Sequence, residues 1–153
     1  MNAFYESYLE RLEWLHAEVN SVIQGLPPDA LDWCPGKEMN SIAVLVTHLT
    51  GAERFWIGDV GAGEPSGRDR EAEFLVQGLS SAALQERLEQ AGKYARQTLS
   101  RFALEDLEKP HTSPRDGQVA NLAWCLLHAL QHASQHLGHI QMTRQLWEQR
   151  EAS

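Results

Sequence analysis

The stretch WCLLHALQHASQHLGHIQMTRQLW, residues 124–147, decides the fold of this chain. Its apolar residues recur at intervals of three and four, which is the spacing of one face of an amphipathic helix. At about 100° per residue, four histidines of the stretch fall along one slowly turning side of that helix. These are His128, His132, His136 and His139. The pattern predicts one long helix over about 118–148, with a line of imidazoles on one face.

The segment HASQH places His132 and His136 one helical turn apart, so that their Cβ atoms are roughly 5–6 Å apart on one face. Two imidazoles in this arrangement can bind one metal ion. A third from another helix would complete a set of three, and three protein ligands plus water are typical of a catalytic metal. Histidines on a partly exposed helix face are also common, so the pair alone does not decide between a metal site and an ordinary surface.

A second stretch, NSIAVLVTHLTGAERFWIGDV, residues 40–60, is apolar around most of its circumference. It predicts a central, largely buried helix over about 41–60. His48 lies among apolar neighbours there, and an unpaired buried polar group costs about 1–3 kcal/mol. A hydrogen-bonded core histidine would meet that need, and so would a metal ion shared with the HASQH pair. We expect the metal.

Two further amphipathic helices are predicted over about 3–24 and about 81–102. The segment 61–79 is rich in glycine and charge, and we expect it to be a mobile loop. No stretch alternates between apolar and polar residues for long, so little or no sheet is expected beyond a stray strand pair. Four amphipathic helices pack as a bundle. The predicted fold class is therefore all-α, with residues 1–153 forming a single four-helix-bundle domain whose long connectors permit crossover links.

The composition is that of an ordinary globular domain, with 42% hydrophobic and 22% charged residues in a chain of 153. A net charge of −8 argues against nucleic acid or an anionic membrane as a partner. No apolar run reaches the roughly 20 residues of a membrane span, and the acidic N-terminus lacks the pattern of a signal peptide. The two cysteines form no CxxC pair, which fits a reducing compartment. We expect a cytoplasmic protein.

Three other titratable residues are weaker candidates for a site. Glu53 follows His48 by five residues and so points about 140° away from it on the helix. We expect Glu53 at the rim, or paired with Arg54 or with a neighbouring helix. His16 and His111 stand alone in the sequence and are expected at the surface.

Taken together, the two histidine-bearing stretches resemble the DinB/YfiT-like superfamily of small four-helix-bundle metalloproteins from bacteria. The family's pattern is a histidine in the second helix, then HxxxH-x-G-[QH]-I followed by arginine in the last helix. This chain matches the pattern with His48, His132, His136, Gly138, His139, Ile140 and Arg144. The resemblance covers the whole chain. It departs from many members at residue 139, where they have glutamine.

The resemblance implies one divalent metal per chain, with water in the positions that the protein leaves open. The three ligands that it implies are His48, His132 and His136. Zinc, nickel and iron all suit such a set, so the identity of the metal stays open. We expect His128 and His139 to lie beside the ligands as candidate catalytic residues. Gly138 is expected to let another helix backbone approach closely.

Three functions remain in competition. The leading hypothesis is a metal-dependent enzyme acting on a small molecule, because relatives include thiol-dependent isomerases and S-transferases. In those enzymes a low-molecular-weight thiol, such as mycothiol or bacillithiol, is deprotonated at the metal and attacks an electrophile. The second is a metal-dependent hydrolase with His128, His139 or Glu53 as general acid or base. The third is a metal-binding stress protein without turnover, which a fourth protein ligand such as His128 would favour.

A homodimer is also expected. Phe55, Trp56, Ile57 and Val60 crowd the end of the second predicted helix, which is more apolar surface than one bundle seam buries. Exposed patches of this kind usually mark an interface, and Trp147 has no obvious inward neighbour. The family resemblance agrees, because such proteins are often dimeric. The same four residues could instead pack beneath the 61–79 segment.

Overall fold

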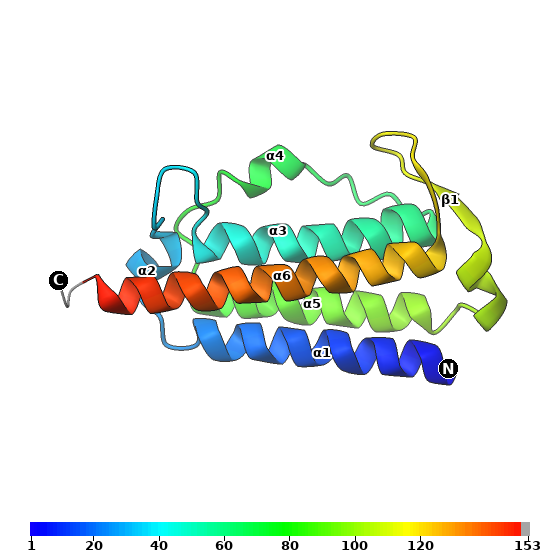
Figure 1. Ribbon diagram of the computed structural model, residues 1–153, viewed down its shortest axis with the longest axis horizontal. Coiled ribbons are helices and arrows are strands. Elements are labelled where there is room, and N and C mark those ends of the chain that lie inside the picture. Colours follow the sequence, from blue (N-terminus) through cyan, green and yellow to red (C-terminus); the bar gives the residue numbers. More distant parts are fainter. Residues whose placement is uncertain (151–153) are drawn as a thin grey trace.

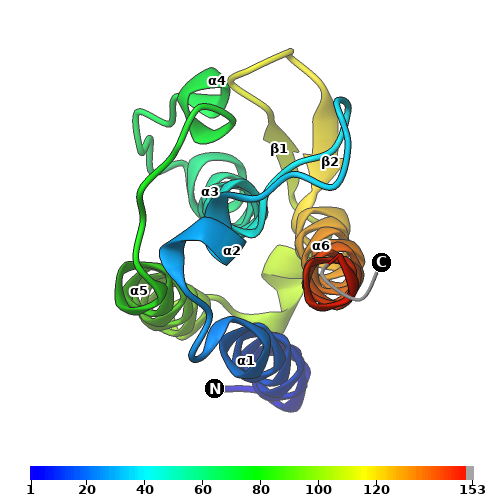
Figure 2. The ribbon, with the colours of Figure 1, turned by 90° about the vertical axis from the view of Figure 1, so that its left-hand side faces the viewer.

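Four long helices form a bundle, two of them running in each direction, in the computed structural model, which describes residues 1–150 (Figure 1). They are α1 (Ala3–Ile23), α3 (Ile42–Arg54), α5 (Ser81–Leu99) and α6 (Leu122–Gln149). Seen end-on, each helix occupies a corner, with α1 and α3 diagonally opposite and α5 and α6 filling the other two corners (Figure 2). The predicted all-α four-helix bundle is therefore confirmed.

Each long helix begins at a residue whose side chain accepts a hydrogen bond from the backbone N–H three residues later. Such an N-cap satisfies one of the orphan donors of the first turn. The four caps are Asn2, Ser41, Ser80 and Asn121. These local signals, together with the apolar stripes, explain why the helices start where they do.

The last helix starts four residues later than predicted, because the residues before it form a strand. Strand β1 (Pro110–Thr112) pairs antiparallel with β2 (Val119–Asn121), with His111 opposite Ala120. This hairpin is the stray strand pair that the sequence allowed. It lies at the end of the bundle where α6 begins (Figure 1).

The segment between α3 and α5 is more regular than the predicted mobile loop. The α3 helix continues as a π-helix (Phe55–Ala62), which ends at Gly63 in the left-handed conformation. A one-turn helix, α4 (Arg70–Glu73), follows and lies over α3 (Figure 2). Two further short elements, α2 (Pro28–Asp32) and a 3₁₀ turn (Leu104–Glu108), interrupt the other connectors.

The π-helix changes which residues of the second stretch face the core. Phe55, Trp56, Ile57 and Val60 are all buried, with exposed fractions of 1–6%, and pack with residues of α1 and α6. The prediction that they form an exposed patch was therefore wrong, and their apolar surface gives no argument for a dimer. Trp147 also has a neighbour, since its ring packs edge-on against Trp33 at 5.8 Å.

No helix among the described residues has the length and apolar character that crossing a bilayer requires.

Candidate metal centre

Two helices bring three imidazoles together at one side of the bundle. His48 comes from the middle of α3, and His132 and His136 come from the middle of α6. One ring nitrogen from each lies within 4.8 Å of the other two. The Nε2 atoms of His132 and His136 are 3.1 Å apart. The trio predicted from spacing is thus assembled by the packing of α3 against α6.

The protonation state of the α6 pair suits metal binding. Burial, followed by the proximity of neighbouring histidines, lowers the pKa of His132 to about 3 and that of His136 to about 4. Both rings are therefore neutral at physiological pH, and a neutral imidazole offers a lone pair to a cation. A divalent ion prefers nitrogen ligands at about 2.0–2.1 Å, and the three nitrogens are close enough together to be candidate ligands of a single ion.

On the side away from the α6 pair, His48 is hydrogen-bonded to a carboxylate that was not predicted from the sequence. Its Nδ1 lies 2.8 Å from Oε2 of Glu73, which leaves Nε2 to face the α6 pair. Burial raises the pKa of Glu73, but hydrogen bonds from Arg68 and His48 outweigh burial, so the net pKa is lowered and the group is ionised. A carboxylate on the outer nitrogen of a metal-ligating histidine fixes its tautomer and raises its basicity.

Arg68 completes this support. Its Nε and one terminal nitrogen donate to the two oxygens of Glu73 at 2.5 and 2.8 Å. Both side chains are nearly buried, with exposed fractions of 10% and 8%. Such a two-point contact holds a planar carboxylate in one orientation. The chain of contacts therefore runs from Arg68 through Glu73 to His48.

Gly51 makes this arrangement possible. A Cβ at position 51 would lie 2.1 Å from Oε1 of Glu73, so no other residue leaves room for the carboxylate. The glycine thus lets α4 rest directly on α3, one turn from His48. Gly138 plays no such part, because a Cβ there would meet no atom within 4 Å, and the prediction of a close helix approach at Gly138 was wrong.

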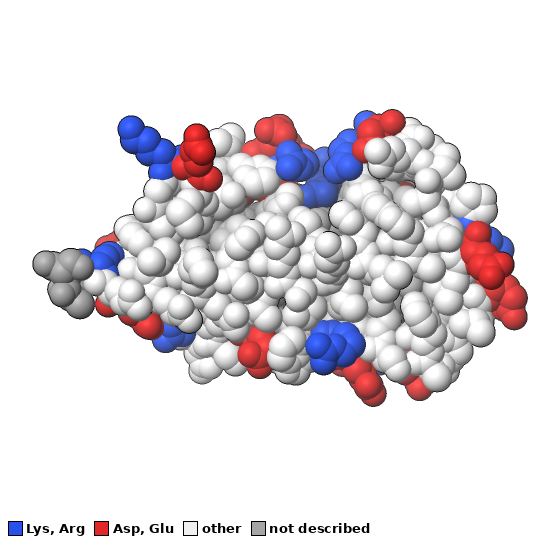
Figure 3. Space-filling model, in the orientation of Figure 1, with Lys and Arg blue, Asp and Glu red and all other residues white. Residues whose placement is uncertain are grey.

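A cavity of about 210 Å³ opens beside His48 and His132. Three arginines line it together with two tryptophans, and no acidic residue of the described chain does so. The lining arginines are Arg68, Arg70 and Arg115. Figure 3 shows basic side chains gathered around a hollow on this side of the molecule. On a chain with a net charge of −8, this local concentration favours an anionic ligand.

His128 forms part of the cavity wall. Its ring stacks on Trp124 with centroids 4.8 Å apart and lies 6.1 Å from the ring of His132. Burial and the charge of Arg115 lower its pKa, so the ring is neutral and able to accept a proton. It is not part of the three-nitrogen group, so the side of that group facing the cavity is left open.

The arginine-lined cavity has no contribution from His139, His16, Glu53 or Cys125. His139 is exposed on α6, with its ring 5.5 Å from that of His136, and it lines a different cavity. His16, expected at the surface, is instead buried. It is hydrogen-bonded to Glu53, which is buried and paired with another helix, the last of the alternatives expected for it, and does not lie at the rim. Cys125 is buried, and burial raises the pKa of its thiol to about 11, so it is not a reactive nucleophile.

The comparison with protein families identifies this architecture. A model described as the DinB superfamily matches residues 11–140. The chain belongs to the DinB superfamily. No curated protein sequence matches this DinB-family chain.

Solved structures share the fold at low sequence identity. A conserved protein from Enterococcus faecalis has a TM-score of 0.79 at 15% identity, with 95% of this chain and 97% of that chain covered. YfiT from Bacillus subtilis, described as a probable metal-dependent hydrolase with an unusual four-helix bundle topology, has a TM-score of 0.77 at 13% identity, covering 95% and 89%. A DinB-like protein from Bacillus cereus has a TM-score of 0.73 at 13% identity, covering 96% and 91%.

Neither the carboxylate partner of His48 nor the arginines that line the cavity were predicted from the sequence. One signal was present, because the segment DREAEF, residues 69–74, carries the alternating charges and the N-cap aspartate of a short helix. The distances along the chain gave no help. Glu73 lies 25 residues from His48, and Arg115 lies in the turn of a hairpin whose position only the fold determines.

Proposed function

We propose that this DinB-family protein is a metal-dependent hydrolase of small anionic molecules. One observation carries the proposal: three imidazole nitrogens lie within 4.8 Å of one another, beside a cavity lined by arginines. A divalent ion held there would supply Lewis acidity and lower the pKa of a coordinated water. The solved neighbour YfiT is itself described as a probable metal-dependent hydrolase.

The chain's own residues would divide the remaining work. Arg70 and Arg115, each about half exposed, would bind the charged end of a substrate. Trp56 and Trp124 would form an apolar wall beside it, since both line the same cavity. His128, neutral and next to His132, is the group best placed to accept a proton from attacking water.

An ester pair tests the proposal. The mono-para-nitrophenyl ester of glutaric acid is anionic, whereas para-nitrophenyl acetate is neutral. Protein loaded in turn with Zn²⁺, Ni²⁺ or Fe²⁺ should hydrolyse the anionic ester with at least one ion, and His132→Ala should lower kcat/KM by about 100-fold or more. The double variant Arg70→Gln with Arg115→Gln should raise KM for the anionic ester about tenfold. Its KM for the neutral ester should not change. The control variant Arg101→Gln should have the wild-type KM for both esters. Equal hydrolysis by metal-free protein would refute the hydrolase.

Thiol-dependent transfer is the second candidate, and the arginine-lined cavity favours it as well. Many small cellular thiols carry carboxylates, and a metal ion held by the same three histidines would lower the pKa of a bound thiol as it would that of water. Cys125 is buried with a raised pKa, and the exposed Cys34 does not line the cavity, so the thiol would have to come from a cosubstrate. A chromogenic electrophile distinguishes the two functions: turnover only with added thiol indicates transfer, and turnover without thiol indicates hydrolysis.

A further inference from the structure

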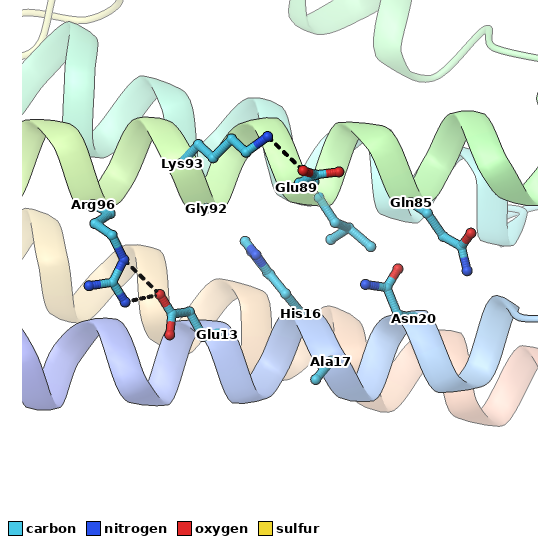
Figure 4. A pocket seen from close by; sticks show the side chains of 10 residues that line it. Glu13, His16, Ala17, Asn20, Gln85, Glu89, Gly92, Lys93 and Arg96 are labelled. Carbon is cyan, nitrogen blue, oxygen red and sulfur yellow. Dashed lines mark hydrogen bonds and ion pairs between the residues drawn. The ribbon is translucent and has the colours of Figure 1, made fainter.

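A second cavity lies on the opposite side of the bundle, in the groove between α1 and α5. It has a volume of about 440 Å³, which is within the usual range for small-molecule sites. Figure 4 shows His16 and Asn20 pointing from α1 toward α5, with Gly92 facing them. The three-histidine site plays no part in this groove, because none of its residues lines it.

His16 is anchored from the interior by a carboxylate. Its Nε2 lies 3.0 and 2.9 Å from the two oxygens of Glu53, which comes from α3 across the diagonal of the bundle. The side chains of His16 and Glu53 are 9% and 2% exposed. Burial lowers the pKa of His16, but the charge and hydrogen bond of Glu53 outweigh it, so the net pKa is raised. A raised pKa favours the protonated ring, in which both nitrogens donate, and the second nitrogen points away from Glu53.

That second nitrogen faces the groove. Nδ1 of His16 bonds to no group among residues 1–150, and it lies opposite Gly92. A Cβ at position 92 would come 3.4 Å from Nδ1, so any larger side chain there would cover the ring edge. Glycine inside a helix costs about 1 kcal/mol relative to alanine. In α5, glycine at position 92 therefore makes the helix less stable but leaves the edge of the His16 ring accessible.

Asn20 adds a second unpartnered group one turn along α1. Its Oδ1 is buried and has no hydrogen-bond partner among the described residues. Buried amide oxygens are normally hydrogen-bonded, so this unpaired oxygen beside the groove is a candidate acceptor for a ligand. The terminal torsion of asparagine is broad, which lets the amide turn toward a bound group. The floor therefore offers one N–H donor and one oxygen acceptor.

The rim carries balanced charge. Arg96 pairs with Glu13 across the groove, and Lys93 pairs with Glu89 along α5. All four side chains are roughly half exposed or more, so they can exchange partners with a solute. A simple anion would be repelled by the two glutamates, and a simple cation by the lysine and the arginine. A molecule that carries both charges can place each one beside side chains of the opposite sign.

We propose that the groove between α1 and α5 binds a small zwitterionic amino acid. Its carboxylate accepts a hydrogen bond from Nδ1 of His16, and its ammonium group donates to Oδ1 of Asn20. The two side chains are four residues apart, so their Cβ atoms are roughly 5–6 Å apart. The two charged groups of the ligand must span a similar distance, which favours an amino acid with a short chain between them.

Nitrogen chemical shifts of the His16 ring test this directly. Full-length protein labelled with ¹⁵N and loaded with Zn²⁺ is titrated with glycine, β-alanine and γ-aminobutyrate, and His16→Gln assigns the signal. At least one zwitterion should shift the His16 nitrogens saturably. Acetate and methylammonium, which carry the two charges separately, should bind at least about ten times more weakly. The signals of His132 and His136 should not move.

Gly92→Leu provides the blocking variant. It raises the helix propensity of α5, so loss of binding would not reflect loss of folding, and thermal unfolding checks this. We expect it to weaken the zwitterion at least about tenfold. Gln97→Leu places the same side chain on an exposed position of α5 outside the groove and should leave binding unchanged.

Three results would overturn the proposal. The first is that none of the three zwitterions shifts the His16 signals saturably up to about 50 mM. The second is that acetate binds as tightly as the zwitterions do. The third is that Gly92→Leu binds the zwitterions as tightly as the wild type does.

Discussion

At the scale of single residues, burial and mutual proximity keep His132 and His136 neutral. Their pKa values of about 3 and about 4 lie below the roughly 6.5 of an unfolded chain. Between these values the unfolded state binds more protons than the folded state, so the metal-free protein loses stability as pH falls from about 6.5 toward about 4. His16 acts in the opposite direction, because its folded pKa is raised.

Thermal unfolding of metal-free protein at pH 7 and about pH 5 measures this linkage. The wild type should melt at a lower temperature at the lower pH. The double change of His132 and His136 to asparagine should reduce that drop, because the two titrating groups are gone. An equal drop in both proteins would show that these rings are not responsible.

The outer partner of His48 gives a second prediction. Glu73→Gln keeps the shape of the side chain but removes the charge that orients and polarises the imidazole. Metal affinity should fall about 10- to 100-fold, as is typical when such a partner is lost. Competition with a chelator of known affinity measures the change. Glu71→Gln, on the exposed side of α4, is the matched control and should bind as the wild type does.

The histidine pair on α6 was open to prediction because helical spacing fixes which side chains share a face. The spacing in HASQH places His132 and His136 on one face, and the apolar neighbours of His48 and the family resemblance add the third residue. The pairing of His16 with Glu53 was not open to prediction in this way. It joins residues 37 positions apart on diagonal helices, and no local pattern states how the helices are rotated relative to one another.

At the scale of elements, α4 is the part of the site that was not predicted from the sequence. It has only four residues, too few for hydrophobic periodicity to show, and it is held on α3 by contacts that include the hydrogen bond between Glu73 and His48. The long helices, by contrast, were predicted to within a few residues at most ends. The exceptions were the start of α6, where a strand competes, and the end of α3, where the π-helix turns Trp56 toward the core.

Gly51→Ala tests the docking of α4. Alanine favours the helical conformation, yet its Cβ would occupy the position of the Glu73 carboxylate. We expect metal affinity to fall by about the same factor as in Glu73→Gln, because both changes release His48 from its partner. Gly138→Ala, where a Cβ meets nothing, should leave affinity unchanged and stabilise α6. Normal metal binding by Gly51→Ala would contradict this account of α4.

At the scale of the whole molecule, α6 presents an uncharged face. Trp124, Leu127 and Met142 are 45–60% exposed along it. Figure 3 shows few charges over the middle of the molecule, where α6 runs in front in Figure 1. We propose that a second copy covers this face, in place of the patch at the end of α3 that proved to be buried.

Light scattering should give about twice 17.2 kDa for the wild type. Leu127→Glu with Met142→Glu should shift the protein toward the monomer, because each carboxylate would be buried without a partner. Leu75→Glu, at a residue 79% exposed beyond α4, is the control and should remain dimeric. A wild-type mass of 17.2 kDa at micromolar concentration would contradict the dimer.

The central claim is that one divalent ion per chain is held by His48, His132 and His136. Elemental analysis of untagged protein, expressed with Zn²⁺, Ni²⁺ and Fe²⁺ available and then dialysed, tests it most directly. We expect about one ion per chain in the wild type and in His128→Ala, and less than about a tenth as much after alanine replaces any one of the three ligands. Metal retained by the double variant His132→Ala with His136→Ala would place the ion elsewhere and contradict the claim.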